Sequence, residues 1–287
     1  MDQKLRRAAL AAQKNEITEY HVYTRLAKLL KDEKNAGILR AIGEAEKRHA
    51  AWWQTKTGVS VKPSRSKIFW RVFMARLLGL TFVLKRMEKN EGTASKGYLG
   101  LSEAFPELKK ISEEEAEHEK SLLDMLDEER LQYVGSIVLG LNDALVELTG
   151  ALAGFTLALA DNKLITLAGL VTGISASFSM AASDFLASRA EGDPRAAKSA
   201  IYTGVAYFIT VILMILPFLL IENSFISLAV TLAIVVLIIF CFNYYLAVAK
   251  DLDFKKRFFE MSAISLGVAA FSFGISFLLK ALLGIDL

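Results

Sequence analysis

Five long apolar runs dominate the second half of the sequence. They are separated by short polar segments and cover residues 134–160, 164–187, 200–221, 225–249 and 259–283. Each has roughly the 20 apolar-rich residues that an α-helix needs to cross a bilayer. The pattern therefore predicts a membrane domain of five transmembrane helices over residues 131–287.

The first 130 residues follow a different pattern, in which apolar positions recur at helical spacing among many charged residues. Gly and Pro residues in the segment 57–65 break this pattern once. Four helices are predicted, over residues 2–31, 33–57, 67–98 and 107–130. Four long helices of this kind are typical of a four-helix bundle, so the whole chain is predicted to be all-α.

The charges divide the chain at the same place. Residues 1–130 hold 25 of the 34 Lys and Arg residues and 20 of the 31 Asp and Glu residues. The net charge of +3 is small and dispersed, so nucleic acid is not an expected partner. The single cysteine, Cys241, excludes a disulfide framework, and the charged N-terminal helix has no signal-peptide character. We therefore expect residues 1–130 in the cytoplasm and the lipid bilayer around residues 131–287.

Acidic residues and histidines in the first domain form a recognisable set. The second and fourth predicted helices each carry the spacing Glu-x-x-His, which puts a carboxylate and an imidazole on the same helix face. A di-iron carboxylate site in a bundle combines two such pairs with acids from the other two helices. The predicted metal ligands are Glu16, Glu46, His49, Glu88, Glu91, Glu115 and His118.

These residues resemble the ferritin-like domain of the rubrerythrin and erythrin family. In that family a tyrosine follows the first-helix glutamate after seven residues, which matches Glu16 and Tyr23. The resemblance implies a di-iron site that oxidises, stores or senses iron. This chain lacks the cysteine-rich rubredoxin module that rubrerythrins usually carry, so efficient electron delivery to a peroxidase centre is not expected.

The membrane domain also contains acids. Asp143 and Glu147 lie one helical turn apart within the first apolar run, and Met180 and Asp184 are spaced in the same way in the second. A carboxylate at membrane depth costs at least about 2.5–3.5 kcal/mol, so it is rare there without a role. One interpretation is a cation path lined by all four side chains. The alternatives are acids that hydrogen-bond to neighbouring helices and a methionine that fills the core.

The sequences around these residues, GLNDALVELTG (140–150) and SMAASDFLASR (179–189), resemble the vacuolar iron transporter family. Asp143 and Met180 match positions that the resemblance assigns to the metal path, whereas Asp184 stands where the family more often has glutamate. Familiar members insert a glutamate-rich segment after the second membrane helix, but here only the loop 188–199 is present. The whole chain resembles the membrane-bound ferritin type, which joins both domains. The resemblance implies a homodimer with the path between protomers.

Lys and Arg residues in the loops 188–199 and 250–260 predict the orientation, because basic loops stay on the cytoplasmic side. This places Leu287 outside a cell membrane. The leading hypothesis is proton-coupled export of Fe²⁺, with Mn²⁺ as a second candidate. The rival is a membrane-anchored ferroxidase or peroxidase. The apolar segment 68–84, which Arg71 and Arg76 interrupt, is expected either to pack on the membrane surface or to exchange between protomers.

Overall fold

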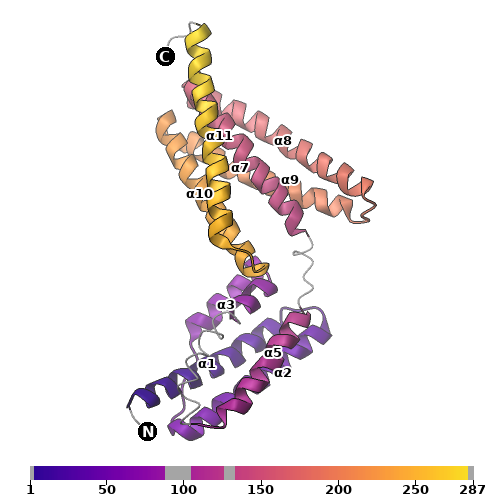
Figure 1. The fold of residues 1–287 in the computed structure, drawn as a ribbon, viewed down its shortest axis with the longest axis vertical. Helices are drawn as coiled ribbons and strands as arrows, with labels where there is room; N and C mark the ends of the chain where they lie inside the picture. The colour runs from indigo at the N-terminus through magenta and orange to yellow at the C-terminus, as the bar shows by residue number, and fades with distance from the viewer. Residues whose placement is uncertain (1–2, 88–104, 126–132, 284–287) are drawn as a thin grey trace. The chain divides into compact units, whose positions relative to one another are not determined.

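The computed structural model describes residues 3–87, 105–125 and 133–283. It divides the chain into two compact units, Met1–Glu128 and Glu129–Leu287, which we call the N-terminal and the C-terminal unit (Figure 1). All regular secondary structure in the described residues is helical. The all-α prediction is therefore confirmed.

The N-terminal unit is built on a hairpin of two long helices, α1 (Gln3–Ala27) and α2 (Glu33–Thr57). Helix α3 (Arg65–Leu78) packs on α1, and α5 (Leu108–Met125) packs on α2. The core at one end of this unit joins Trp53 and Leu108 to small residues of α1. Trp52 and Phe105 cover it with edge-to-face ring contacts, which are a favourable arrangement for aromatic pairs.

Helix α2 has the predicted range 33–57, and both of its ends are capped. Asp32 is the N-cap, and its side chain accepts a hydrogen bond from the backbone N–H of Lys34. Gly58 follows the last turn with a φ of 71°, where glycine avoids the strain of a side chain, and its N–H donates to the carbonyl of Gln54. These two caps fix the part of α2 that carries Glu46 and His49.

The third helix differs from the prediction. The periodic pattern predicts one helix over residues 67–98, but α3 ends at Leu78 and Gly79 adopts a φ of 97°. Helical structure resumes at Leu80. The apolar pattern continues on both sides of Gly79, so periodicity alone does not reveal the break; glycine permits it because it lacks a Cβ atom. Residues 88–98 lie outside the described part of the chain.

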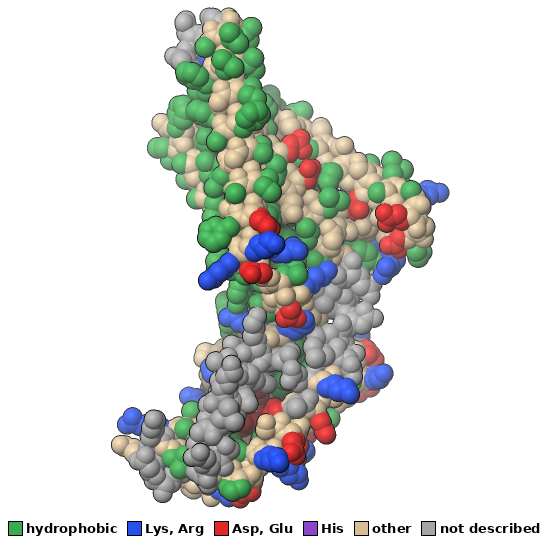
Figure 2. All heavy atoms as spheres, in the orientation of Figure 1, with side chains coloured by type: hydrophobic (Ala, Val, Ile, Leu, Met, Phe, Trp, Pro, Cys, Tyr) green, Lys and Arg blue, Asp and Glu red, His purple; other side chains and the backbone are tan. Residues whose placement is uncertain are grey.

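The C-terminal unit contains five helices that are long and apolar enough to cross a membrane, counted over the described residues. They are α7 (Val134–Leu159), α8 (Asn162–Ala190), α9 (Ala196–Leu220), α10 (Ser224–Ala249) and α11 (Phe254–Leu283). Hydrophobic side chains are spread along the visible face of these helices (Figure 2). The five predicted membrane spans are thus confirmed as helices of sufficient length.

Polar caps define the short connections between these helices. Asp161 caps α8 by accepting hydrogen bonds from two backbone N–H groups, and Asn223 caps α10 in the same way. Lys250, directly after α10, and Lys256, in the first turn of α11, are exposed. The charged positions therefore mark the helix ends, as expected for spans that have apolar middles.

Helix α7 is the centre of the C-terminal unit, because it packs against α8, α9, α10 and α11. Its residues Leu145, Leu148 and Leu152 are fully buried in the core of the unit. Close packing depends on glycine at two sites of α7. A Cβ atom on Gly140 would overlap the carbonyl oxygen of Thr203 on α9, and one on Gly150 would lie 2.9 Å from Ser272 Oγ on α11.

Gly140→Ala should therefore destabilise the C-terminal unit, while Gly135→Ala on the same helix should not. The alanine methyl group at 140 meets backbone atoms that cannot turn away, and overpacking of this kind costs about 1–3 kcal/mol. A Cβ atom at Gly135 meets nothing within 4 Å. Thermal unfolding of both variants in detergent measures the difference. Equal stability would show that α7 and α9 do not meet at Gly140.

Candidate metal centre and membrane carboxylates

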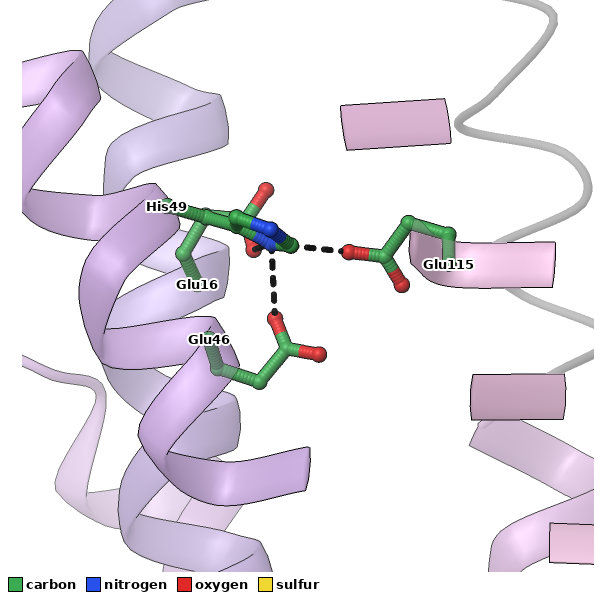
Figure 3. A group of neighbouring side chains, drawn as sticks. All are labelled: Glu16, Glu46, His49 and Glu115. Carbon is green, nitrogen blue, oxygen red and sulfur yellow. Dashed lines mark ion pairs between the residues drawn. The ribbon is translucent and has the colours of Figure 1, made fainter. Parts of the chain in front are cut away.

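The N-terminal unit brings together side chains from three helices that lie far apart in the sequence. Glu16 comes from α1, Glu46 and His49 come from α2, and Glu115 comes from α5 (Figure 3). One potential ligand atom from each of the four residues lies within 4.8 Å of all the others. Among the described residues this is the one group of three or more His, Cys, Asp or Glu side chains with such spacing.

His49 is at the centre of this cluster. Its Nδ1 atom lies 3.0 Å from Glu115 Oε1, 3.8 Å from Glu16 Oε2 and 3.9 Å from Glu46 Oε2. The side chains of Glu16, Glu46 and His49 are buried. Three carboxylates thus converge on Nδ1 of one imidazole ring, and only Glu115, with its side chain 33% exposed, is partly open to water.

The second Glu-x-x-His pair joins the same cluster. His118 Nδ1 lies 3.6 Å from Glu46 Oε1 and 3.9 Å from Glu115 Oε2. The rings of His49 and His118 are stacked with centroids 6.2 Å apart. Five of the seven predicted ligands therefore meet at one place, and the remaining two, Glu88 and Glu91, lie outside the described residues.

Glu114 is not one of the predicted metal ligands, but it contacts one of them. Its Oε2 atom accepts a hydrogen bond from His49 Nε2 at 3.0 Å. A ligating histidine commonly donates its other ring N–H to a carboxylate, which fixes the orientation of the ring. Residues 113–115 are three consecutive glutamates, and only the fold shows that Glu114 faces Nε2 of His49 while Glu115 faces Nδ1.

Burial and neighbouring carboxylates shift the pKa values of the residues in this cluster. Removal from water raises the pKa of Glu46 well above its usual value, and the neighbouring carboxylates of Glu16 and Glu115 add to the effect. Burial also raises the pKa of Glu115. For His49, burial by itself would lower the pKa, but the close carboxylates of Glu115, Glu16 and Glu114 outweigh it and raise the pKa to about 10. The metal-free cluster therefore holds protons at neutral pH.

The donor set fits a transition-metal ion. The Nδ1 atoms of both His49 and His118 are buried, face the carboxylates and make no hydrogen bond of good geometry. Buried polar atoms normally have partners, so two such nitrogens beside three carboxylates fit a binding site for a cation. Mixed carboxylate and imidazole ligands suit iron, manganese and zinc.

Metal binding by the full chain in detergent should therefore release protons. Because the pKa of His49 is about 10, this ring is protonated at pH 7 and must lose its proton before Nδ1 can bind a metal. The same argument makes the metal affinity rise with pH. Calorimetry in buffers of different ionisation enthalpy measures the number of protons. Binding at pH 7 with no proton release would contradict the arrangement around His49.

The predicted path residues of the C-terminal unit lie on α7 and α8. Asp143 is half-buried and Glu147 is exposed, both on α7. Tyr207 of α9, which is fully buried, donates a hydrogen bond from its hydroxyl group to Glu147 Oε2 at 2.8 Å. Met180 is partly buried and packs against the core of the unit, which agrees with a role in packing.

Asp184 lies in a separate polar network. Its Oδ2 atom accepts hydrogen bonds from Ser199 Oγ and Thr203 Oγ1, both at 2.7 Å and both from α9. Ser199 in turn lies 2.6 Å from Ser136 Oγ on α7. The structure therefore gives Glu147 and Asp184 different partners. Sequence reasoning missed these α9 residues, although Ser199, Thr203 and Tyr207 recur every four positions along one helix face.

Comparison with known families supports the membrane assignment. Residues 134–198 match the model of the VIT family, and this match covers α7, α8 and the start of α9 with all four predicted path residues. A comparison with curated proteins found no match. The C-terminal unit is thus a multi-pass membrane domain with a segment similar to the VIT family, which supports a transporter of metal ions.

Proposed function

We propose that this protein is a proton-coupled exporter of Fe²⁺ from the cytoplasm, with Mn²⁺ as a second substrate. The observation that carries the proposal is the VIT family match over residues 134–198. Asp143 and Met180 of the proposed path belong to this segment and lie on helices long enough to cross a membrane. Carboxylates at membrane depth are functional by default, because their burial in lipid is costly.

The proposed path uses ligands that can exchange a metal ion for protons. Asp143 and Glu147 lie on successive turns of α7, so both carboxylates can serve one ion in sequence. A carboxylate binds either a proton or a metal ion, and this competition couples the two fluxes. Met180 would add a thioether ligand and Asp184 a further carboxylate. Because Glu147 is exposed on α7, we place the path between the two protomers of a homodimer.

We propose that the N-terminal unit is a ferritin-like domain with a di-iron site. The residues that would hold the metal ions are Glu16, Glu46, His49, Glu115 and His118, together with Glu88 and Glu91. Bound iron would supply redox chemistry for oxidation or sensing of the substrate. The chain's own contribution is to exclude water, to orient His49 through Glu114 and to accept the protons that a metal ion displaces.

The test of transport is metal flux in proteoliposomes. Fe²⁺ presented to the cytoplasmic face should appear on the opposite side while protons move the other way, and acidifying the receiving side should accelerate transport. Vesicles without protein give the background. If no flux appears while iron added with O₂ is oxidised at the N-terminal unit, the membrane-anchored ferroxidase becomes the better function.

The proposed orientation places the loops 188–199 and 250–260 in the cytoplasm, because both are rich in Lys and Arg. In a background with Cys241→Ser, an impermeant thiol reagent should label Asp286→Cys in intact cells. It should label Asp193→Cys only after the cells are opened. The reverse labelling pattern would invert the orientation and the direction of transport with it.

A further inference from the structure

Helix α3 presents an aromatic face to the outside of the N-terminal unit. The exposed fractions are 65% for Phe69, 56% for Trp70 and 42% for Phe73. The ring of Phe73 stacks with those of both other residues, at centroid distances of 6.2 Å and 5.5 Å. Three contiguous exposed aromatic rings form a large apolar patch, and such patches usually mark an interaction surface.

The opposite face of α3 is fixed to the unit. Ile68 and Ala75 are buried, and Arg71 forms an ion pair with Glu19 of α1 at 3.1 Å. Arg71 therefore turns inward and serves the fold. The aromatic face is thus held outward by packing on its reverse side.

Basic side chains lie near both ends of the aromatic face. Arg65 and Arg76, near the two ends of α3, are exposed, and so is Lys67. The helix contains no acidic residue. Aromatic rings flanked by Lys and Arg are the combination that binds the interface of a bilayer, where the rings enter the headgroup region and the cations meet anionic lipids.

We propose that α3 is a membrane-docking helix that lies in the interface of an anionic lipid bilayer. At 14 residues it is too short to span a membrane, but it can lie flat with its aromatic face about 5–10 Å below the headgroups. Its charge favours lipid over a second copy of the same surface, because two identical basic faces would repel each other. The C-terminal unit supplies the bilayer, since its five helices tether the chain there.

Helix α3 is linked to the metal cluster through α1. Helix α3 packs on α1, and its contact residue Glu19 lies one turn from the ligand Glu16 on α1. A docked α3 therefore holds the ligand-bearing face of the N-terminal unit at a defined place near the membrane. This inference does not depend on transport, because it concerns only the surface of the N-terminal unit.

Tryptophan fluorescence offers a direct test, because all three tryptophans of the chain, Trp52, Trp53 and Trp70, belong to the N-terminal unit. Trp53 is fully buried and Trp52 partly buried, so both act as an internal reference. The full chain is reconstituted in vesicles of anionic lipid that carry bromine near the headgroup. Bromine quenches only the rings that enter the bilayer.

We expect the brominated lipid to remove the part of the emission that Trp70→Phe also removes. The remaining emission of that variant should be unquenched. Arg65→Gln and Arg76→Gln should each lower the ratio of docked to free helix about fivefold at low salt, and added salt should act in the same direction. Lys110→Gln, which removes a basic residue of α5 whose side chain is 82% exposed, is the charge-matched control and should have little effect.

Unquenched Trp70 emission in anionic vesicles of brominated lipid would overturn the proposal. If soluble acrylamide also fails to quench Trp70, another protein surface, such as a second copy, covers the aromatic face instead. Phe73→Leu keeps the patch apolar and should preserve quenching, which separates docking from loss of folding.

Discussion

Asp143→Asn is expected to reduce Fe²⁺ flux in proteoliposomes to the level of protein-free vesicles. Asparagine has nearly the same size as aspartate, so α7 should pack as before. It carries no negative charge and no exchangeable acidic proton, so it can neither attract the cation nor couple its movement to protons. Initial rates of metal uptake measure the effect.

Three comparisons make this result specific. Glu222→Gln, in the exposed connection before α10, is the charge-matched control and should keep the rate of the unmodified protein. Met180→Leu should lower the rate partly, because leucine retains the packing against the core but has no sulfur. If Asp143→Asn transports iron at the unmodified rate, the acid is structural and the anchored-enzyme function gains support.

Replacing both His49 and His118 by alanine should remove most of the iron bound by the N-terminal unit. Residues that only hydrogen-bond to metal ligands change metal affinity by about 10–100-fold. Loss of two ligating imidazoles should exceed that range, because two of the converging donor atoms disappear. Metal analysis of the purified full chain gives the stoichiometry, and the background Asp143→Asn removes binding at the proposed transport path.

The chain provides a matched control for this experiment. It contains three histidines, and the third, His21, stands outside the ligand cluster on α1, with its ring beside that of Tyr20. His21→Ala should leave the bound iron unchanged. Unaltered stoichiometry in the double variant would instead show that the cluster around His49 is not the iron site.

The loss of transport in Asp143→Asn and the loss of bound iron in the histidine variant should also be separable. The ligand cluster belongs to the unit Met1–Glu128 and Asp143 belongs to the unit Glu129–Leu287, and each unit has its own internal packing. Asp143→Asn should therefore stop transport while the N-terminal unit still binds iron. The histidine variant should lose bound iron while α7 to α11 keep their fold.

Much of this architecture could be predicted from the sequence. The membrane helices follow from apolar runs of sufficient length, since lipid leaves a helix few alternatives for its backbone hydrogen bonds. The end of α2 at Gly58 follows from local backbone chemistry. The two Glu-x-x-His pairs indicate a metal site because helical spacing puts each pair on one face. All of these signals are local, so a single stretch of sequence contains them.

Only the tertiary structure decided how the local pieces combine. It placed Glu114 against His49 Nε2 and its neighbour Glu115 against Nδ1. It also placed Tyr207 against Glu147, 60 positions away along the chain. It ended α3 at Gly79 and left the aromatic face of that helix exposed. Helical periodicity shows which residues share a face, but the partner of that face depends on packing between segments distant in the sequence, where many pairings bury similar apolar area.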